Sequence, residues 1–336
     1  MNGALILLLS LYKLLQNIVF AQVTFDPTAT TAIVNQSCQC YPGTTCPAGT
    51  VGGFDVRIVN TGTTCPTGYV ACCTSGGGGT NPGCGIRRIP PSQHPVGQAA
   101  VGAYPWMVAI LTNNNGYVGG GVLISATHVL TVAHKVASYR GGDIKVRLGA
   151  WDLSAATNNA YPPVEISVAK VTANEYYDPV TLRNDVAVLK LSSAAPIATS
   201  LNINTACLPT AAPAAGTSCW VTGWGTTAFI GGTMPTILKE VDVLVVNQPQ
   251  CQTALRTTRL GASFNLDNSF MCAGGQVGKD ACTGDGGSPL VCSTNNGPYQ
   301  VVGLVTWGIG CASPGVPGVY TSVSSLSSWI NDAKMT

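Results

Sequence analysis

Charged residues are scarce in this sequence of 336 residues: Asp, Glu, Lys and Arg make up 9% of it, against about a quarter of an average globular protein. The formal net charge is only +2. A protein that binds nucleic acid or an anionic membrane through charge needs a dense basic patch, which this composition does not supply. We therefore expect neither a nucleic-acid partner nor a membrane partner.

Long hydrophobic runs are missing beyond the N-terminus. The apolar stretch from Ala4 to Leu15, followed by Val19-Phe20-Ala21, has the arrangement of a secretory signal peptide. We predict cleavage after Ala21, so that residues 1–21 are removed and the mature protein is secreted and extracellular. An uncleaved membrane anchor is the alternative, but the run is too short to span a bilayer comfortably.

Histidine is also rare, with three residues, whereas cysteine is abundant, with 14. An even number of cysteines in a secreted chain indicates disulfides, which leave no thiol for catalysis or for a link between chains. Cys38-Gln39-Cys40 and Cys72-Cys73 look like zinc-ligand pairs, but the oxidising compartment argues against zinc. Asp143 and Asp178 lack the dense acidic loop of a calcium site. We expect no metal and no cofactor.

Six of the cysteines fall between Cys38 and Cys73, and a Gly-rich stretch from Ser75 to Asn81 follows them. So short a segment buries too little apolar surface to fold alone, so three disulfides, each contributing about 2 to 4 kcal/mol, would hold it. We assign residues 22–37 to an N-terminal extension and residues 38–73 to a stapled module. The N-glycosylation sequon Asn35-Gln36-Ser37 lies just before it.

Beyond Tyr104 the sequence consists of short β-branched runs separated by turns, which favours an all-β barrel or sandwich. The expected strands are Trp106–Leu111, Gly121–Ile124, Val129–Val132, Ile144–Leu148, Val186–Leu191, Val241–Val246 and Val301–Trp307. One helix is predicted at Ser324–Ala333, because its apolar residues recur at helical spacing.

Three motifs carry the candidate chemistry. They are Leu130-Thr131-Val132-Ala133-His134, Arg183-Asn184-Asp185-Val186-Ala187-Val188-Leu189, and Thr283-Gly284-Asp285-Gly286-Gly287-Ser288-Pro289-Leu290. In sequence and in order they resemble the histidine, aspartate and nucleophile motifs of trypsin- and chymotrypsin-like (S1) serine proteases. Trp220–Gly225, Trp307-Gly308 and Gly318–Tyr320 extend the resemblance over residues 104–336. It implies a chymotrypsin-like double β-barrel with a C-terminal helix.

The resemblance implies a role for each motif residue. His134 and Asp185 would be remnants of the catalytic triad, and Gly286 stands where the family has its nucleophilic serine. Because glycine has no atom that can attack a carbonyl, we predict that the protein is not an enzyme but a pseudoprotease. The amides of Gly284 and Gly286 could still shape an oxyanion hole.

The alternative nucleophile is Ser288, since the motif has its serine two residues late. Its position, about 6 Å along the chain from the attack point, argues against this role. Asp280 stands at the base of the family's specificity pocket, with Gly308 and Gly318 on its walls. This pocket could bind a Lys or Arg side chain without cutting, or it could be a collapsed remnant.

Two further departures from the family concern activation and disulfides. Residues 74–103 hold the linker and the activation segment, in which Gln93-His94-Pro95-Val96 replaces the expected Ile-Val-Gly-Gly. Arg88 is the nearest cleavage site for a trypsin-like protease, although a cut there leaves an N-terminus about four residues too long on the family's spacing. A cysteine pair near the histidine is also absent, since Gly119 and Lys135 occupy its two positions.

The resemblance also implies the disulfide pairing. In the protease domain the expected pairs are Cys84 with Cys207, Cys219 with Cys292, Cys251 with Cys272, and Cys282 with Cys311. The N-terminal module resembles the clip domains of arthropod protease homologues, through its cysteine spacing and its central Val56-Arg57-Ile58 segment. There the expected pairs are Cys38 with Cys72, Cys40 with Cys65, and Cys46 with Cys73; other small disulfide modules remain an alternative.

Together these features resemble a clip-domain serine protease homologue. The implied function is that of a non-catalytic cofactor or scaffold in an extracellular protease cascade, such as prophenoloxidase activation in arthropod melanisation and innate immunity. The expected partners are extracellular proteases, their zymogens or prophenoloxidase, and the oligomeric state stays open. Two alternatives are an active trypsin-like endopeptidase that uses Ser288 and an inhibitory or recognition pseudoprotease, such as a venom or pattern-binding protein.

Overall fold

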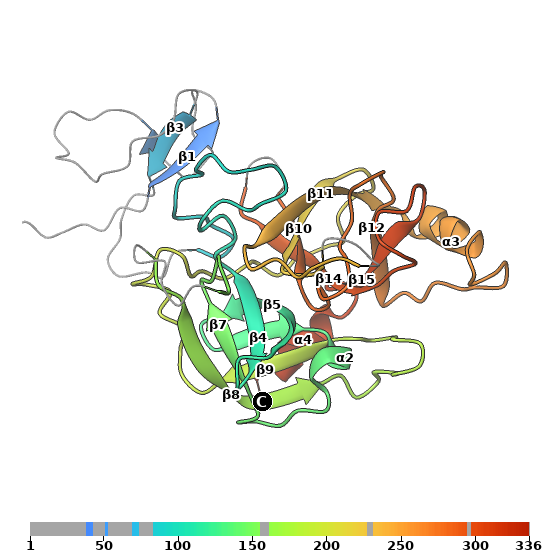
Figure 1. Ribbon diagram of the computed structural model, residues 1–336, viewed down its shortest axis with the longest axis horizontal. Helices are drawn as coiled ribbons and strands as arrows, with labels where there is room; N and C mark the ends of the chain where they lie inside the picture. Colours follow the sequence, from blue (N-terminus) through green and yellow to red (C-terminus); the bar gives the residue numbers. More distant parts are fainter. Residues whose placement is uncertain are drawn as a thin grey trace, which may run out of the picture. The chain divides into compact units, whose positions relative to one another are not determined.

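The computed structural model describes the strand residues 38–42, 51–52 and 69–73, and then residues 83–154, 161–226, 231–293 and 297–335 (Figure 1). The predicted signal peptide, the N-terminal extension and the sequon at Asn35 lie outside these residues. Within the described part, no helix has the length and hydropathy needed to cross a membrane.

The cysteine module contains a three-stranded antiparallel sheet in the order β1-β3-β2. Its strands are β1 (Cys38–Pro42), β2 (Val51–Gly52) and β3 (Tyr69–Cys73). Two of the cysteines, Cys46 and Cys65, lie outside the described residues. The three pairings expected here therefore stay predictions.

The first half of the protease domain is a closed antiparallel barrel with the strand order β4-β5-β6-β9-β8-β7. Its elements are β4 (Met107–Thr112), β5 (Tyr117–Ser125), β6 (His128–Thr131), the short helix α2 (Ala133–Val136), β7 (Ile144–Leu148), β8 (Val164–Ala173) and β9 (Ala187–Leu191). Strand β7 alternates buried and half-buried residues, the period of a strand with one face in a core.

The second half is another closed barrel, in the order β10-β11-β12-β15-β14-β13. It contains β10 (Ser218–Gly223), β11 (Lys239–Val246), the helix α3 (Gln248–Arg256), β12 (Phe270–Gly274), β13 (Pro289–Cys292), β14 (Gln300–Trp307) and β15 (Pro317–Ser322), and the helix α4 (Ser327–Ala333) follows. The all-β double barrel predicted from the sequence is therefore confirmed.

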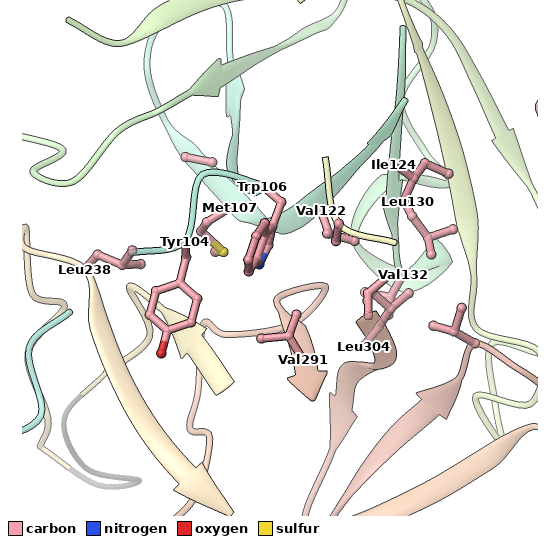
Figure 2. Close-up of a cluster of buried hydrophobic side chains, with 14 of the residues drawn as sticks. Tyr104, Trp106, Met107, Val122, Ile124, Leu130, Val132, Leu238, Val291 and Leu304 are labelled. Carbon is pink, nitrogen blue, oxygen red and sulfur yellow. The ribbon is translucent and has the colours of Figure 1, made fainter. Parts of the chain in front are cut away.

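The two barrels share a buried hydrophobic cluster that includes Trp106, Leu130, Val291 and Leu304 (Figure 2). Strand β4 is apolar at almost every residue because both of its faces are buried. Its Met107, Ala109 and Leu111 belong to the shared cluster, whereas its Val108 and Ile110 fill the interior of the first barrel. This explains the continuous apolar run at the start of the domain.

The predicted C-terminal helix is present but shorter than expected, since it begins at Ser327 rather than Ser324. The serines before it instead form a hydrogen-bonded turn, in which Ser322 Oγ lies 2.9 Å from Ser325 Oγ. The helix α3 was not predicted. Its N-cap is Asn247, whose side chain accepts a hydrogen bond of 2.9 Å from the amide of Gln250.

Candidate functional site

Most of the candidate catalytic and specificity residues line one pocket, to which both barrels contribute. His134 comes from α2 in the first barrel, while Gly284 and Gly286 come from the loop before β13. Gly308 and Gly318 lie at the ends of β14 and β15. All five line a cavity of about 270 Å³ together with Asp280.

His134 and Asp185 form a close hydrogen-bonded pair. His134 Nδ1 lies 2.6 Å from Asp185 Oδ2, and the His134 amide donates to Asp185 Oδ1 over 2.8 Å. Because a carboxylate only accepts hydrogen bonds, Nδ1 carries the proton and Nε2 is left as the acceptor facing the pocket. Asp185 is completely buried, and its carbonyl oxygen accepts a hydrogen bond of 2.8 Å from the Thr321 hydroxyl in the second barrel.

Gly286 faces this histidine. A Cβ atom at Gly286 would lie 3.1 Å from His134 Nε2, so a side chain at this position would point at the acceptor nitrogen. A serine there would have its hydroxyl within reach of a general base. Glycine leaves the histidine-aspartate pair with no group to activate.

Ser288 is fully buried and is not among the residues that line the pocket. Its hydroxyl oxygen lies only 2.1 Å from where a Cβ atom at Gly120 would be, and 2.9 Å from a Cβ atom at Gly223. The hydroxyl thus points into packed backbone. A substrate carbonyl in the pocket could reach the Ser288 hydroxyl only by displacing this backbone.

Asp285, which precedes Gly286, is held by backbone amides. Its Oδ1 accepts from the Gly225 amide at 2.8 Å, and its Oδ2 accepts from the Cys282 amide at 2.9 Å. Burial raises the pKa of Asp285, while these two hydrogen bonds oppose that rise. The residues that replace the family's activation motif, Gln93 to Val96, are exposed to solvent.

Asp280 lines the pocket and is mostly enclosed. Its Oδ2 accepts a hydrogen bond of 2.9 Å from the Ala312 amide, and its Oδ1 lies 2.8 Å from where a Cβ atom at Gly318 would be. Loss of hydration on burial raises the pKa of Asp280 to about 6, and the charge of Asp285 adds to the rise. A carboxylate in such surroundings lacks a partner of opposite charge, which a basic ligand would supply.

Lys135 is a pocket residue that the sequence did not assign to the site. Its side chain runs along Gly119, where a Cβ atom would lie 3.3 Å from Lys135 Cγ. Farther out, its Cε lies 2.7 Å from where a Cβ atom at Gly286 would be. The lysine stem therefore lies against both Gly119 and Gly286, the positions at which the resemblance predicts a cysteine and the nucleophile.

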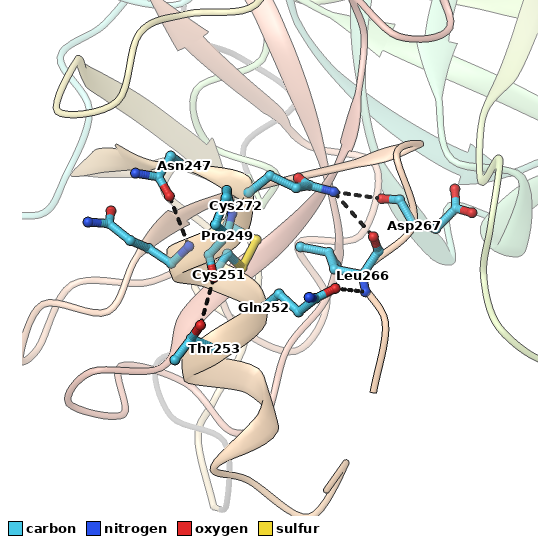
Figure 3. Close-up of a disulfide and its surroundings, with 10 residues drawn as sticks. Asn247, Pro249, Cys251, Gln252, Thr253, Leu266, Asp267 and Cys272 are labelled. Atoms are coloured by element: carbon cyan, nitrogen blue, oxygen red, sulfur yellow. Dashed lines mark hydrogen bonds between the residues drawn. A yellow bond between two sulfur atoms is a disulfide. The ribbon is translucent and has the colours of Figure 1, made fainter. Parts of the chain in front are cut away.

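Four disulfides hold the described part of the protease domain: Cys84–Cys207, Cys219–Cys292, Cys251–Cys272 and Cys282–Cys311. The last of these lines the pocket. Cys251–Cys272 ties α3 to β12 (Figure 3), and neither cysteine lines the pocket. There Gln252 Oε1 accepts from the Leu266 amide at 2.8 Å, so polar side chains support the same helix.

Arg88, the candidate cleavage site, is half-buried against the first barrel. Its guanidinium donates hydrogen bonds to the carbonyl oxygens of Ser200 and Ile203. The neighbouring Arg87 lies over the rings of Tyr104 and Tyr299, 4.8 Å and 4.3 Å from their centroids. A protease would have to pull this segment off the barrel before cutting it.

No cluster of three or more His, Cys, Asp or Glu side chains that could hold a metal ion occurs within the described residues.

Comparison with known proteins defines the class to which this fold and site belong. A family model described as Trypsin matches residues 96–330. The chain is 46% identical over 321 residues, 88% of its length, to an inactive CLIP domain-containing serine protease A3 of Aedes aegypti, and the match covers 66% of that protein. It is 43% identical to phenoloxidase-activating factor 2 of Galleria mellonella, over 70% of this chain and 82% of the other.

The similarity also extends to trypsins. The chain is 39% identical to trypsin I-P1 of Gallus gallus, over 68% of this chain and 83% of the trypsin. The chain therefore belongs to the trypsin family, and within it to the clip-domain serine protease homologues. Several of its clip-domain relatives carry the word inactive in their names.

Proposed function

We propose that this protein is a secreted, non-catalytic serine protease homologue that acts as a cofactor or scaffold in an extracellular protease cascade. The observation that carries the proposal is Gly286 opposite an otherwise intact His134–Asp185 pair. Losing the nucleophile alone lowers kcat by about 10⁶ in a serine protease, whereas the surrounding binding surfaces need not change.

The relatives point to the kind of cascade. One relative is named a phenoloxidase-activating factor, and another is the proclotting enzyme of Tachypleus tridentatus, 34% identical over 262 residues. We infer that extracellular proteases, their zymogens or prophenoloxidase are the partners, and that melanisation is the pathway. The pairing of an N-terminal clip-like module with a pocket that retains Asp280 supports a binding role.

A reconstituted cascade tests this function. Purified full-length protein, alone or after processing by an upstream protease, is added to prophenoloxidase and its activating protease, and phenoloxidase activity is measured. We expect the rate or the yield of active phenoloxidase to change, and the protein to bind at least one cascade member. A chain that neither alters activation nor binds any member would exclude the cofactor role.

The enzyme alternative depends on Ser288. Its burial against Gly120 and Gly223, outside the pocket lining, argues against it. An inhibitory role would use the same pocket and scaffold, and it predicts reduced rather than increased phenoloxidase activity in the same assay.

A further inference from the structure

Gly119, Lys135 and Gly286 form one packed trio at the mouth of the pocket. The Gly286 carbonyl oxygen accepts a hydrogen bond of 3.0 Å from the Gly120 amide, which ties the nucleophile loop to β5 next to Gly119. The Lys135 stem passes Gly119, with Cγ and Cδ 3.3 Å and 3.5 Å from a Cβ atom placed there, and reaches Gly286 with its Cε. The ammonium nitrogen is one bond farther on.

This arrangement brings unused hydrogen-bond donors together where substrate would react. Within the described part of the chain, neither Lys135 nor the amides of Gly284 and Gly286 make a hydrogen bond or ion pair. All three residues line the pocket. The Asp185 carboxylate is engaged by His134. This end of the pocket therefore offers a positive charge and two donors to an anion.

The two ends of the pocket have opposite preferences. Asp280 offers a negative charge to a basic side chain, while Lys135 and the glycine amides offer donors at the reaction centre. One chemical group satisfies both ends: an Arg or Lys residue with a free α-carboxylate. Such a C-terminus is what a trypsin-like protease creates when it cuts a chain.

We infer that the pocket binds the newly formed C-terminal Arg or Lys of a cleaved chain, its side chain at Asp280 and its carboxylate at Lys135. The inference rests on the proposed non-catalytic function, since an enzyme has to release this end as product. An uncut chain presents a neutral carbonyl instead, for which the lysine charge gives little preference. Lys135 thus makes the pocket selective for a partner already processed by an upstream protease.

The test is a binding titration of the full-length protein with two fluorescent peptides that differ only at the end. One ends in Arg with a free carboxylate and the other in Arg-carboxamide. A charge-assisted hydrogen bond in a partly enclosed site predicts about tenfold tighter binding of the free acid. Mass spectrometry of each mixture reports any conversion of the amide to the acid.

Variants separate the two ends of the pocket. Lys135→Met should bring the ratio of acid to amide affinity close to one. Lys135→Arg should keep the preference for the acid. Asp280→Asn should weaken both peptides together. Lys170→Met, which removes an exposed lysine of β8 away from the pocket, is the matched control and should change neither affinity.

Equal affinity of the wild type for both peptides, or a preference that survives in Lys135→Met, would overturn the inference. Failure of both peptides to bind would also overturn it, while leaving the cofactor role intact. Hydrolysis of the carboxamide by the wild type would instead overturn the proposed non-catalytic function.

Discussion

The two walls of the pocket differ in how far they depart from an active trypsin-like protease. The wall from the first barrel has Lys135 and Gly119 in place of the cysteine pair expected in the family, and the Lys135 side chain lies against Gly286. The wall from the second barrel keeps Asp280, the two glycines beside it and the Cys282–Cys311 disulfide. Gly286, at the position predicted for the nucleophile, belongs to the second barrel, in the loop before β13, while His134 and Asp185 still form their pair. The departures from the family pattern thus cluster around the predicted reaction centre, at Gly119, Lys135 and Gly286, and leave Asp280 in place.

This contrast suggests that the pocket was kept for binding. A chain released from all constraint would be expected to lose Asp280, because burial raises the pKa of its carboxyl to about 6 and so disfavours its charged form. Four predictions test the contrast, from the largest expected effect to the smallest.

Removing the Cys282–Cys311 disulfide, in the second-barrel wall of the pocket, should have the largest effect on the free energy of unfolding. The double substitution Cys282→Ser/Cys311→Ser opens a loop of 29 residues, and we expect it to lower the free energy of unfolding by about 3 kcal/mol. It should also weaken binding of Arg-carboxamide peptides, because both cysteines line the pocket. Chemical denaturation and a peptide titration measure the two effects.

The matched control is Cys251→Ser/Cys272→Ser, which opens a loop of 21 residues in the same barrel at two cysteines that do not line the pocket (Figure 3). It should cost similar stability and leave peptide affinity unchanged. If both double variants lose peptide binding to the same extent, the disulfide at the pocket has no special role there.

Introducing a disulfide into the first-barrel wall of the pocket should have a smaller effect on the free energy of unfolding. Gly119→Cys/Lys135→Cys would close a loop for which chain entropy predicts about 3 kcal/mol of stabilisation. A Cβ atom at Gly119 would also lie 2.8 Å from the Gly286 carbonyl oxygen, so we expect part of the gain to be lost and about 2 kcal/mol to remain. Thermal unfolding with and without reductant measures the difference. A destabilised oxidised variant would show that this wall has lost the geometry for a disulfide.

Substituting Asp280 should affect binding rather than folding. We expect Asp280→Asn to weaken binding of an Arg-carboxamide peptide by about tenfold, because the guanidinium loses its charged partner. The unfolding temperature should not fall, since the substitution also removes a buried charge. Unchanged affinity would mean that basic side chains do not reach Asp280.

The change of the unfolding temperature with pH should be the smallest of the four effects. Burial raises the pKa of Asp280 in the folded protein to about 6, above its usual value of 3.8. The contribution of Asp280 to the free energy of unfolding is therefore fully present below the unfolded-state pKa of this group, and it is lost as the pH rises through about 6. Burial also raises the pKa of Asp285, which acts in the same direction. We expect the unfolding temperature to be a few degrees higher at pH 5.5 than at pH 7.5.

The affinity for a basic peptide should change with pH in the opposite direction from the unfolding temperature. Because binding requires ionised Asp280, the affinity should weaken as the pH falls below 6. Tyr320 and Asp285 are titratable groups near this carboxyl, and His134 and Lys135 line the same pocket. The Asp280→Asn variant should remove most of the pH dependence of binding. A wild-type affinity that stays constant from pH 7.5 to pH 5 would contradict the assignment.

Much of the fold could be predicted because the protease domain has local motifs and buried strands. Runs such as Met107 to Leu111 are apolar on both faces, so they stand out in the sequence. Strand β8 was missed because it alternates from Glu165 to Val168, with Glu165 and Ser167 exposed and Ile166 and Val168 buried. A strand with one buried face has no continuous apolar run, and only its period of two marks it in the sequence.

The helix α3 was missed for a related reason. Only Cys251 and Leu255 of its residues are buried, so the apolar stripe is too narrow to be recognised. Its N-cap Asn247 and the Pro249 that follows were the available signals.

The site itself was only partly predictable. The motif residues His134, Asp185, Gly286 and Asp280 could be named from the sequence because each lies in a family motif. Lys135 was recognised only as the place of an absent cysteine. Its role in the pocket depends on where a long flexible side chain lies, which no motif specifies.

The central claim is that this trypsin-family chain binds but does not cut. The most direct test is to incubate the purified protein, before and after cleavage by a trypsin-like protease that is then removed, with a phosphonate probe for serine nucleophiles and with Arg-containing peptides. We predict no covalent adduct and no hydrolysis in either state. An adduct that maps to Ser288, or turnover after Arg that persists after further purification, would contradict the account.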